Sequence, residues 1–445
     1  MKRTELLTLG FMMFSVFFGA GNLIFPPALG QIAGDHAPMA MAGFMTTGVG
    51  LPLMGIIAIA LSGGAYTALI RQRTAPWFAT ALLVILYLII GPIFAMPRTG
   101  AVSFEIGIRP FLSDDWLLIG QILYTVVFFG LSYYLALNPS KIIDRVGNLL
   151  TPALLLFLAV LFVRAFWSPL GPVIASGGAY VAAPYAQGFQ DGYQTMDLLA
   201  SVAIGALVVN AVRMRGITDK KQISIACLVA GGITVVLMAL VYGSLAYIGA
   251  TSAIPLGHSA NGGQLLADAV RLFFGQTGNL LLAIIIALAC LTTCCGVTSS
   301  AAMFFNKLLK NRISYERLLL ISTIFSFLAS NIGLTGLIRL ALPFLVAIYP
   351  VVIVFVLLSL FDSFIGQRKT IYQGAIGLTF IFSIIDAFHE AGLVAVEPLR
   401  NVLVNYLPLY GVMLGWVCPA VIGACLGFAV SLLRKKPALN EAKEV

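Results

Sequence analysis

Charged residues are scarce in this sequence: only 10% of its 445 residues are Asp, Glu, Lys or Arg, whereas 60% are hydrophobic. A water-soluble protein carries roughly 25% charged residues, because its surface must be solvated. The composition therefore excludes an ordinary soluble protein and predicts a chain that crosses the lipid bilayer several times. The formal net charge of +9 is concentrated in alternate loops, so it favours a membrane topology and no nucleic-acid partner.

Histidine and cysteine are also few, with three and six residues. A disulfide framework would need cysteines in polar loops, and all six lie in apolar stretches. A zinc site would need a His/Cys set with short, fixed spacings, and none occurs. We therefore interpret the cysteines as packing residues and assign no catalytic residue.

Long apolar runs dominate what is present. Runs of about 18 or more residues are long enough to span a bilayer. They predict twelve spans, near residues 5–30, 38–63, 77–106, 115–137, 143–166, 185–212, 221–249, 277–307, 315–332, 336–360, 370–388 and 407–433. Two outer segments are longer than ordinary loops, at 168–187 and 250–276, and the second is expected to form a short helix over GGQLLADAVRLFFG.

Lysine and arginine fix the expected orientation, because loops facing the cytoplasm are enriched in them. Both termini should be cytoplasmic, and the first apolar segment, which lacks a small-residue cleavage site, should stay in the protein. Twenty of the 26 basic residues then face the cytoplasm: Lys2, Arg3, Arg71, Arg73, Lys141, Arg145, Arg213, Arg215, Lys220, Lys221, Lys307, Lys310, Arg312, Arg317, Arg368, Lys369, Arg434, Lys435, Lys436 and Lys443.

The first span is interrupted by FFGAGNLIFPP at residues 17–27. Gly19 and Gly21 permit backbone conformations closed to other residues, and the two prolines lack the N–H groups of a continuing helix. We expect the chain to unwind near residues 19–22. Lipid cannot satisfy the freed backbone groups, so the interruption indicates either a packing kink or a binding site for a substrate and an ion.

A second interruption, GFQDGYQTMD, lies in the sixth span at residues 188–197. Tyr193, Gln194 and Thr195 bring hydroxyl and amide groups that can contact a substrate. Asp197 lies at membrane depth, where an ionised carboxylate must be paired, bound to a cation or protonated. It is either a helix cap for the inner half of the span or a coupling group.

The two interruptions lie five spans apart and enter from opposite faces, which is typical of inverted five-helix repeats. The predicted fold class is an all-α polytopic membrane protein of 12 transmembrane helices, with spans 1 and 6 broken. We expect one domain over residues 1–445: repeat 1 at about 5–166, repeat 2 at about 185–360 and two extra helices at about 370–433.

Spans 3 and 8 also carry polar groups. Thr292 and Thr293 lie near the middle of span 8, in ALACLTTCCGVTSS, where hydroxyls either join helices or bind a hard cation such as sodium. In span 3, Arg98 and Glu105 are about two helical turns apart. We expect Arg98 to pair with Glu105 or with Asp197, in a structural, coupling or gating role.

Four segments occur in this order along the chain: FGAGNLIFPP, PRTGAVSFE, GYQTMDLLASVAIGALVVNAVR and ALACLTT. They resemble the bacterial branched-chain amino acid:cation symporters of the BrnQ type, over nearly the whole chain. That family is similar in fold to the sodium-coupled LeuT-like transporters. The resemblance implies uptake of leucine, isoleucine and valine through the bacterial inner membrane, driven by Na⁺ or H⁺.

The resemblance also implies roles for individual residues. The backbone amides of Ala20 and Gly21 would hold the substrate carboxylate, and Asn22 is similar to a ligand of a second ion site. The other implied substrate contacts are Tyr193, Gln194 and Thr195. A sodium ion would be held by Ser15, Phe18, Ala289, Thr292 and Thr293. Cys295, Thr298 and Ser299 fit the same spacing less well, because they lie nearer the cytoplasm. Asp197 departs from the sodium-symporter pattern and keeps proton coupling as an alternative.

These inferences predict a secondary active symporter. Sodium bound between spans 1 and 8 would raise the affinity for an amino acid between spans 1, 3, 6 and 8, whose apolar side chain would contact Tyr193 and Phe94. The alternative from a different class is a passive channel or a membrane-embedded enzyme. A channel usually repeats one filter segment, and an enzyme needs a nucleophile with a base or a metal cluster, neither of which the sequence contains.

Overall fold

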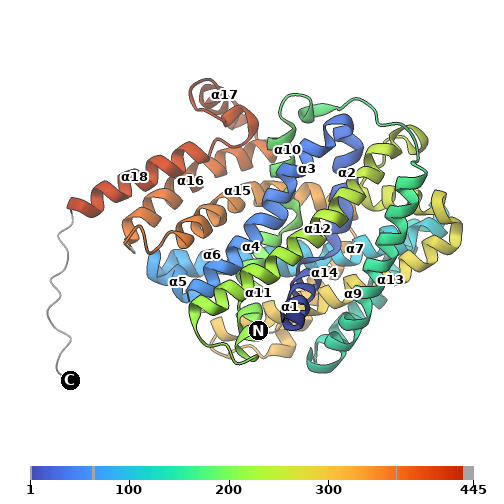
Figure 1. Cartoon of the computed structure of the whole chain (residues 1–445), viewed down its shortest axis with the longest axis horizontal. Coiled ribbons are helices and arrows are strands. Elements are labelled where there is room, and N and C mark those ends of the chain that lie inside the picture. Colours follow the sequence, from blue (N-terminus) through green and yellow to red (C-terminus); the bar gives the residue numbers. More distant parts are fainter. Residues whose placement is uncertain (1–2, 63–65, 138, 367, 434–445) are drawn as a thin grey trace.

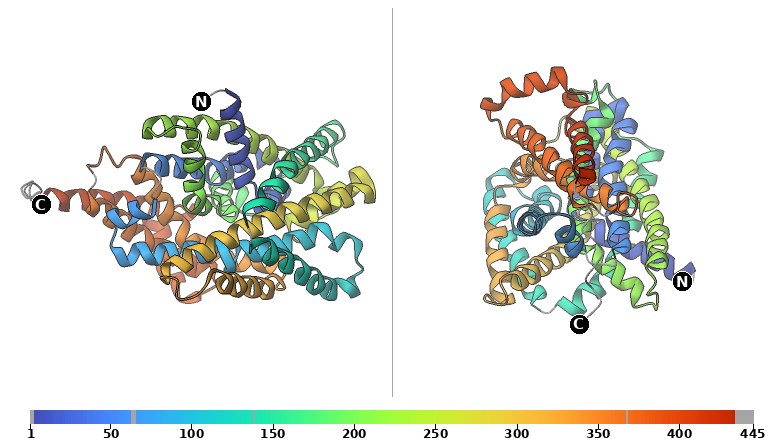
Figure 2. Two further views of the ribbon diagram at one scale, coloured as in Figure 1. Left: turned by 90° about the horizontal axis from the view of Figure 1, so that it is seen from below. Right: turned by 90° about the vertical axis from the view of Figure 1, so that its left-hand side faces the viewer.

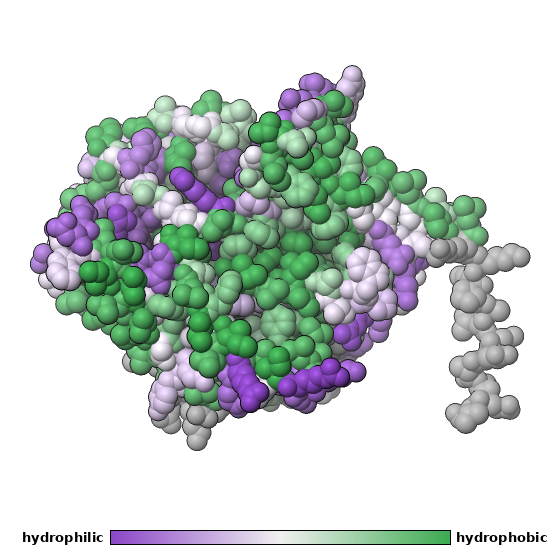
Figure 3. Space-filling view, turned by 180° about the vertical axis from the view of Figure 1, so that it is seen from behind, coloured by the Kyte–Doolittle hydropathy of each residue, from purple (hydrophilic) through white to green (hydrophobic). Residues whose placement is uncertain are grey.

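The computed structural model describes residues 3–62, 66–137, 139–366 and 368–433. In these ranges every regular element is a helix. Seven helical stretches are long and apolar enough to cross a membrane, and two shorter apolar helices, Pro152–Trp167 and Val417–Leu433, accompany them. Figure 3 shows apolar residues over most of one face, as expected for a surface that contacts lipid. The prediction of an all-α membrane protein is confirmed, whereas the count of twelve spans stays a prediction.

The first half of the chain contains the broken span 1 and four further predicted spans. Span 1 consists of α1 (Arg3–Phe17) and α2 (Ala20–Ala33), and span 2 of α3 (Ala37–Met45) and α4 (Leu51–Leu61) joined by a π-helical turn. The remaining helices are α5 (Tyr66–Arg73), α6 (Pro76–Leu88), α7 (Ala95–Gly107), α8 (Leu117–Ala136) and α9 (Pro139–Trp167). Span 3 is α6 and α7, separated by a kink at Gly91.

The second half begins with the broken span 6. It comprises α10 (Pro184–Asp191), the 3₁₀ turn η7 (Gly192–Thr195) and α11 (Asp197–Arg213). The helices α12 (Lys220–Leu256), α13 (Gly262–Leu308), α14 (Tyr315–Ser330) and α15 (Leu334–Leu360) follow, and then α16 (Lys369–Glu390), α17 (Glu397–Tyr406) and α18 (Val417–Leu433). In both Figure 1 and Figure 2, α16 and α18 lie side by side at one end of the molecule.

Two predicted regions differ from the structure in their boundaries. Much of the expected outer loop 250–276 is helical: α12 continues to Leu256, and the expected short helix forms the beginning of α13, set off by a kink at Gly275 with φ of 66°. The last span begins at Val417 and not at residue 407, because left-handed backbone at Leu409 and Met413 turns the chain there.

The basic residues predicted to face the cytoplasm at positions 2, 434, 435, 436 and 443 lie outside the described residues.

Glycines bring the backbone of α2 into direct contact with its neighbours. A β-carbon built on Gly30 would lie 2.0 Å from the carbonyl oxygen of Ala246, and one on Gly249 would lie 2.0 Å from that of Pro27. On Gly262 it would lie 1.7 Å from the carbonyl oxygen of Ile24. No larger residue fits at these positions, so α2 is held in a fixed place against α12 and the start of α13. The prolines at 26 and 27 lie inside α2 and do not end it.

Candidate functional site

The break in span 1 is short, comprises residues 18 and 19, and overlaps the predicted range 19–22 only at Gly19. The helix α1 ends at Phe17, and α2 begins at Ala20. Gly19 has extended backbone, with φ of −109° and ψ of −172°, and no side chain caps the start of α2. The first N–H groups of a helix have no acceptor within the helix, so the first turn of α2 presents backbone donors at the break.

The break in span 6 is a tight turn followed by one left-handed residue. After the 3₁₀ turn Gly192–Thr195, Met196 has φ of 62°, and α11 starts at Asp197. Gly192 is packed so closely against span 2 that an added β-carbon would lie 1.9 Å from the Thr47 hydroxyl oxygen. Interruptions in both spans are therefore present where the sequence predicts them.

A hydrogen bond joins the two breaks. The side-chain nitrogen of Asn22 donates to the Asp197 carboxylate at 3.0 Å and to the backbone oxygen of Phe17 at 2.9 Å. Asn22 is 1% exposed and Asp197 4% exposed. The carboxylate of Asp197 therefore connects span 6 to span 1, while the first N–H of α11 donates to the Thr195 hydroxyl at 3.3 Å.

Arg98 lies beside the same two breaks. Its Nη1 donates to the backbone oxygen of Gln194 at 2.5 Å, and its Nη2 donates to that of Thr195 at 3.4 Å. Its guanidinium is also 5.4 Å from the centre of the Phe25 ring. No carboxylate of the described residues lies within 4.0 Å of it.

Arg98 therefore forms no ion pair within 4.0 Å with either predicted partner in the described residues, although Asp197 attracts it electrostatically. Asp197 is bonded to Asn22, and Glu105 forms an ion pair with Arg109, one turn further along the chain. Glu105 also accepts a hydrogen bond of 2.9 Å from Asn261, at the start of α13. Glu105 thus belongs to a polar contact between α7 and α13 that does not include Arg98.

Aromatic residues line the span 6 break on the side of span 10. The ring of Tyr193 stacks on that of Tyr349 with 4.4 Å between centroids, and the Tyr349 hydroxyl accepts from the backbone N–H of Leu198 at 3.3 Å. Tyr349 was not predicted, although a tyrosine followed by proline within an apolar run is a usable signal. Phe94 packs on Phe344, with 5.3 Å between ring centroids, and its place beside the substrate stays a prediction.

The residues proposed for sodium come partly together. A β-carbon built on Gly19 would lie 3.7 Å from the Thr293 methyl group, so Thr293 lies beside the span 1 break. The Thr292 hydroxyl donates to the backbone oxygen of Ala289 at 2.9 Å, within the same helix. The Thr298 hydroxyl instead donates to Cys294 and to the sulfur of Met96 in span 3. Ser15 lies in the last turn of α1, and Phe18 lies in the break itself.

Sequence comparison identifies the family. A profile described as branched-chain amino acid transport protein matches residues 2–434. The chain belongs to this family.

Two relatives come from Bacillus subtilis. The chain is 42% identical over 431 residues to the branched-chain amino acid permease BrnQ, covering 97% of this chain and 98% of the relative. It is 43% identical over 428 residues to the permease BraB, covering 96% of each. The branched-chain amino acid transport system 2 carrier protein of Pseudomonas aeruginosa is 41% identical over 440 residues, covering 98% of both chains. This family member is therefore a transporter and not an enzyme.

Solved structures show the same fold. The nucleobase-cation-symport-1 transporter Mhp1, closed around bromovinylhydantoin, has a TM-score of 0.62 at 13% identity, covering 96% of this chain and 92% of its own. MhsT in complex with L-phenylalanine has a TM-score of 0.53 at 14% identity, covering 97% and 98%. The expected LeuT-like transporter architecture is thus supported over nearly the whole chain.

Proposed function

We propose that this protein imports leucine, isoleucine and valine across the bacterial inner membrane by symport with Na⁺. The observation that carries the proposal is the buried Asn22–Asp197 hydrogen bond, which links the two helix breaks at one place. Broken helices of this kind form the substrate and ion sites of secondary transporters. The relatives are branched-chain amino acid permeases and carriers.

The substrate would lie between the two breaks. Its carboxylate would accept hydrogen bonds from the first-turn amides of α2, at Ala20 and Gly21, because these donors have no partner within the helix. Asn22, Gln194 and Thr195 would border its polar end. The stacked rings of Tyr193 and Tyr349 would close the site toward span 10.

Sodium would bind between spans 1 and 8. The ligand set is made only of hydroxyl and carbonyl oxygens, which suit a hard cation, and comprises Ser15, Phe18, Ala289, Thr292 and Thr293. Sodium held there would fix the span 1 break and raise the affinity for the amino acid, and the amino acid would raise the affinity for sodium by the same factor.

Proton coupling is the second candidate, and Asp197 is the observation that favours it. Its carboxylate is buried and accepts from a neutral amide, with no ion pair to a described basic residue. A carboxylate in this setting can carry a proton across the membrane with the substrate.

Uptake into proteoliposomes tests the proposal. We expect an inward sodium gradient to drive concentrative uptake of labelled leucine, with isoleucine and valine as competitors and potassium unable to replace sodium. If uptake is independent of sodium but is driven by an imposed proton gradient, the coupling ion is H⁺ and not Na⁺. Failure to concentrate leucine under either gradient would exclude the symport of branched-chain amino acids.

The topology is part of the proposal. We infer twelve spans, arranged as two inverted repeats of five with two additional helices, and both termini in the cytoplasm. Accessibility of single cysteines introduced at Asp219 and Ser113, on opposite sides in this topology, to a membrane-impermeant thiol reagent in intact cells tests the orientation. Only the cysteine at position 113 should react.

A further inference from the structure

Arg98 lies where five predicted spans meet. It is carried by α7 and is 6% exposed. Its guanidinium contacts Phe25 of α2 and the backbone of Gln194 and Thr195. It also interacts electrostatically with Asp197 of α11, and more weakly with Tyr349 of α15 and Cys290 of α13. Spans 1, 3, 6, 8 and 10 therefore converge on this one cation.

The hydrogen-bonding capacity of this guanidinium is only partly used. A guanidinium has five N–H donors, and the contacts with Gln194 and Thr195 use two of them. Its Nε has no acceptor among the described residues. Both acceptors are neutral carbonyl groups, and no described carboxylate lies within 4.0 Å. Asp197 attracts the guanidinium electrostatically but does not contact it, so the remaining N–H donors have no charged acceptor among the described residues.

The unused donors lie beside a second group of donors. A β-carbon built on Gly21 would lie 2.9 Å from Nη2 of Arg98, so the guanidinium touches the first turn of α2. That turn has no side-chain cap, and the start of a helix favours negative charge. Two sets of donors, one carrying a full positive charge, thus adjoin. The nearby Asp197 carboxylate accepts from the side chain of Asn22 and forms no ion pair within 4.0 Å with the guanidinium.

We propose that Arg98 binds the carboxylate of the transported amino acid, together with the first-turn amides of α2. Planar guanidinium and carboxylate groups form two parallel hydrogen bonds, which fix the orientation of a small ligand. The buried Oε1 of Gln194 has no partner among the described residues and is available to accept from the substrate ammonium group. The inference rests on the proposed function and adds the residue that recognises an α-amino acid.

The same residue would connect substrate binding to span 6. Arg98 holds the carbonyl groups of Gln194 and Thr195 within the break while it binds the carboxylate. A ligand that lacks the carboxylate would occupy the apolar part of the site without engaging this contact. Recognition of the carboxylate would therefore decide whether the two breaks close around the ligand.

Binding of leucine and of leucinamide, which has the same shape but no negative charge, tests the inference. Both dissociation constants are measured with purified wild type, Arg98→Gln and Arg98→Lys. The matched control is Arg73→Gln, which alters a buried arginine remote from the breaks. In the wild type, leucine should bind at least about 30-fold more tightly than leucinamide, because a buried charge pair contributes on that scale.

The variants should then separate a binding role from a structural one. Arg98→Gln should weaken the binding of leucine by about 30-fold and change the dissociation constant of leucinamide by less than about threefold. Arg98→Lys should restore part of the preference for leucine over leucinamide. An equal loss for both ligands, or no loss of leucine affinity, would overturn the inference. If Arg98→Gln does not fold, Arg98→Lys and the wild-type preference for leucine over leucinamide remain as tests. A wild type that binds no leucine would instead contradict the proposed function.

Discussion

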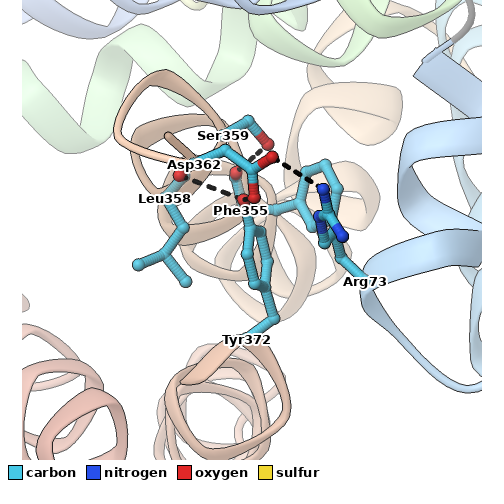
Figure 4. A network of polar contacts seen from close by, with 6 residues as sticks. All are labelled: Arg73, Phe355, Leu358, Ser359, Asp362 and Tyr372. Carbon is cyan, nitrogen blue, oxygen red and sulfur yellow. Dashed lines mark hydrogen bonds and ion pairs between the residues drawn. The ribbon is translucent and has the colours of Figure 1, made fainter. Parts of the chain in front are cut away.

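Two buried arginines of this transporter have opposite surroundings. Arg73, at the end of α5, donates to the Asp362 carboxylate at 2.8 Å, and the other oxygen of Asp362 lies 2.9 Å from the hydroxyl of Tyr372 (Figure 4). Arg98, at the breaks, contacts two neutral carbonyl groups and no described carboxylate. The two residues are similarly buried, at 9% and 6% exposure.

The difference separates a structural charge from a functional one. The Arg73 network joins α5 to the ends of α15 and α16, so its counter-charge belongs to the fold. At the breaks, the fold supplies Asp197 as an electrostatic neighbour of Arg98 but leaves direct contact with a carboxylate to the ligand of our proposal. Functional sites commonly sacrifice stability in this way, because their groups are arranged for a ligand and not for one another.

The largest effect is expected when the same change, Asp to Asn, is made in both regions. Asp197→Asn should lower leucine uptake about 100-fold, because Asp197 joins the two breaks and is the acidic group in the site. Asp362→Asn should leave the KM for leucine within about twofold. Initial uptake rates in proteoliposomes, at equal protein content, measure both. Normal uptake by Asp197→Asn from about pH 5.5 to 8 would reduce Asp197 to a structural role.

Arg73→Gln should act on stability and not on substrate recognition. Removing one partner of a buried pair costs up to about 5 kcal/mol, and the side chains of Arg73 and Asp362 are still 11% and 17% exposed, so we expect roughly 2 kcal/mol. The melting temperature of the purified protein should fall, with leucine affinity unchanged. In the double variant, adding Asp362→Asn to Arg73→Gln should lower the stability by less than Arg73→Gln does alone. If the losses of stability of the two single variants simply add, the pair is not coupled.

The breaks were predictable from the sequence, because glycine, proline and polar residues interrupt a helix at membrane depth, where lipid cannot satisfy the freed backbone groups. The sequence could not predict their partners. Asn22 and Asp197 are 175 positions apart, and the acceptors of Arg98 are backbone carbonyl groups, which no residue type reveals. Arg73 was predicted only as one of the cytoplasmic basic residues, and Asp362 was not singled out, because their pairing depends on how α5 packs beside α15 and α16.

A smaller effect is expected from the proposed sodium ligands. Thr293→Val keeps the shape of the side chain beside Gly19 and removes the hydroxyl, so the sodium concentration for half-maximal uptake should rise about 10-fold. Thr298→Val is the matched control, because its hydroxyl bonds to Cys294 and Met96. Sodium titrations of leucine uptake distinguish them. If Thr298→Val shows the larger shift, the sodium site lies nearer the cytoplasmic end of α13.

The smallest effect is expected at Glu105, whose charge is intermediate between the paired Arg73 and Arg98, which contacts no carboxylate of the described residues. It has a counter-charge, Arg109, but the side chain of that arginine is 34% exposed, so solvent and salt screen the pair. Glu105→Gln keeps an acceptor for Asn261 and should change leucine uptake by less than about threefold. Uptake measured at low and at high ionic strength checks this, since a screened pair should matter less at high salt. A loss as large as that of Asp197→Asn would place Glu105 with the unpaired charges of the site, and pairing alone would no longer separate structural from functional residues.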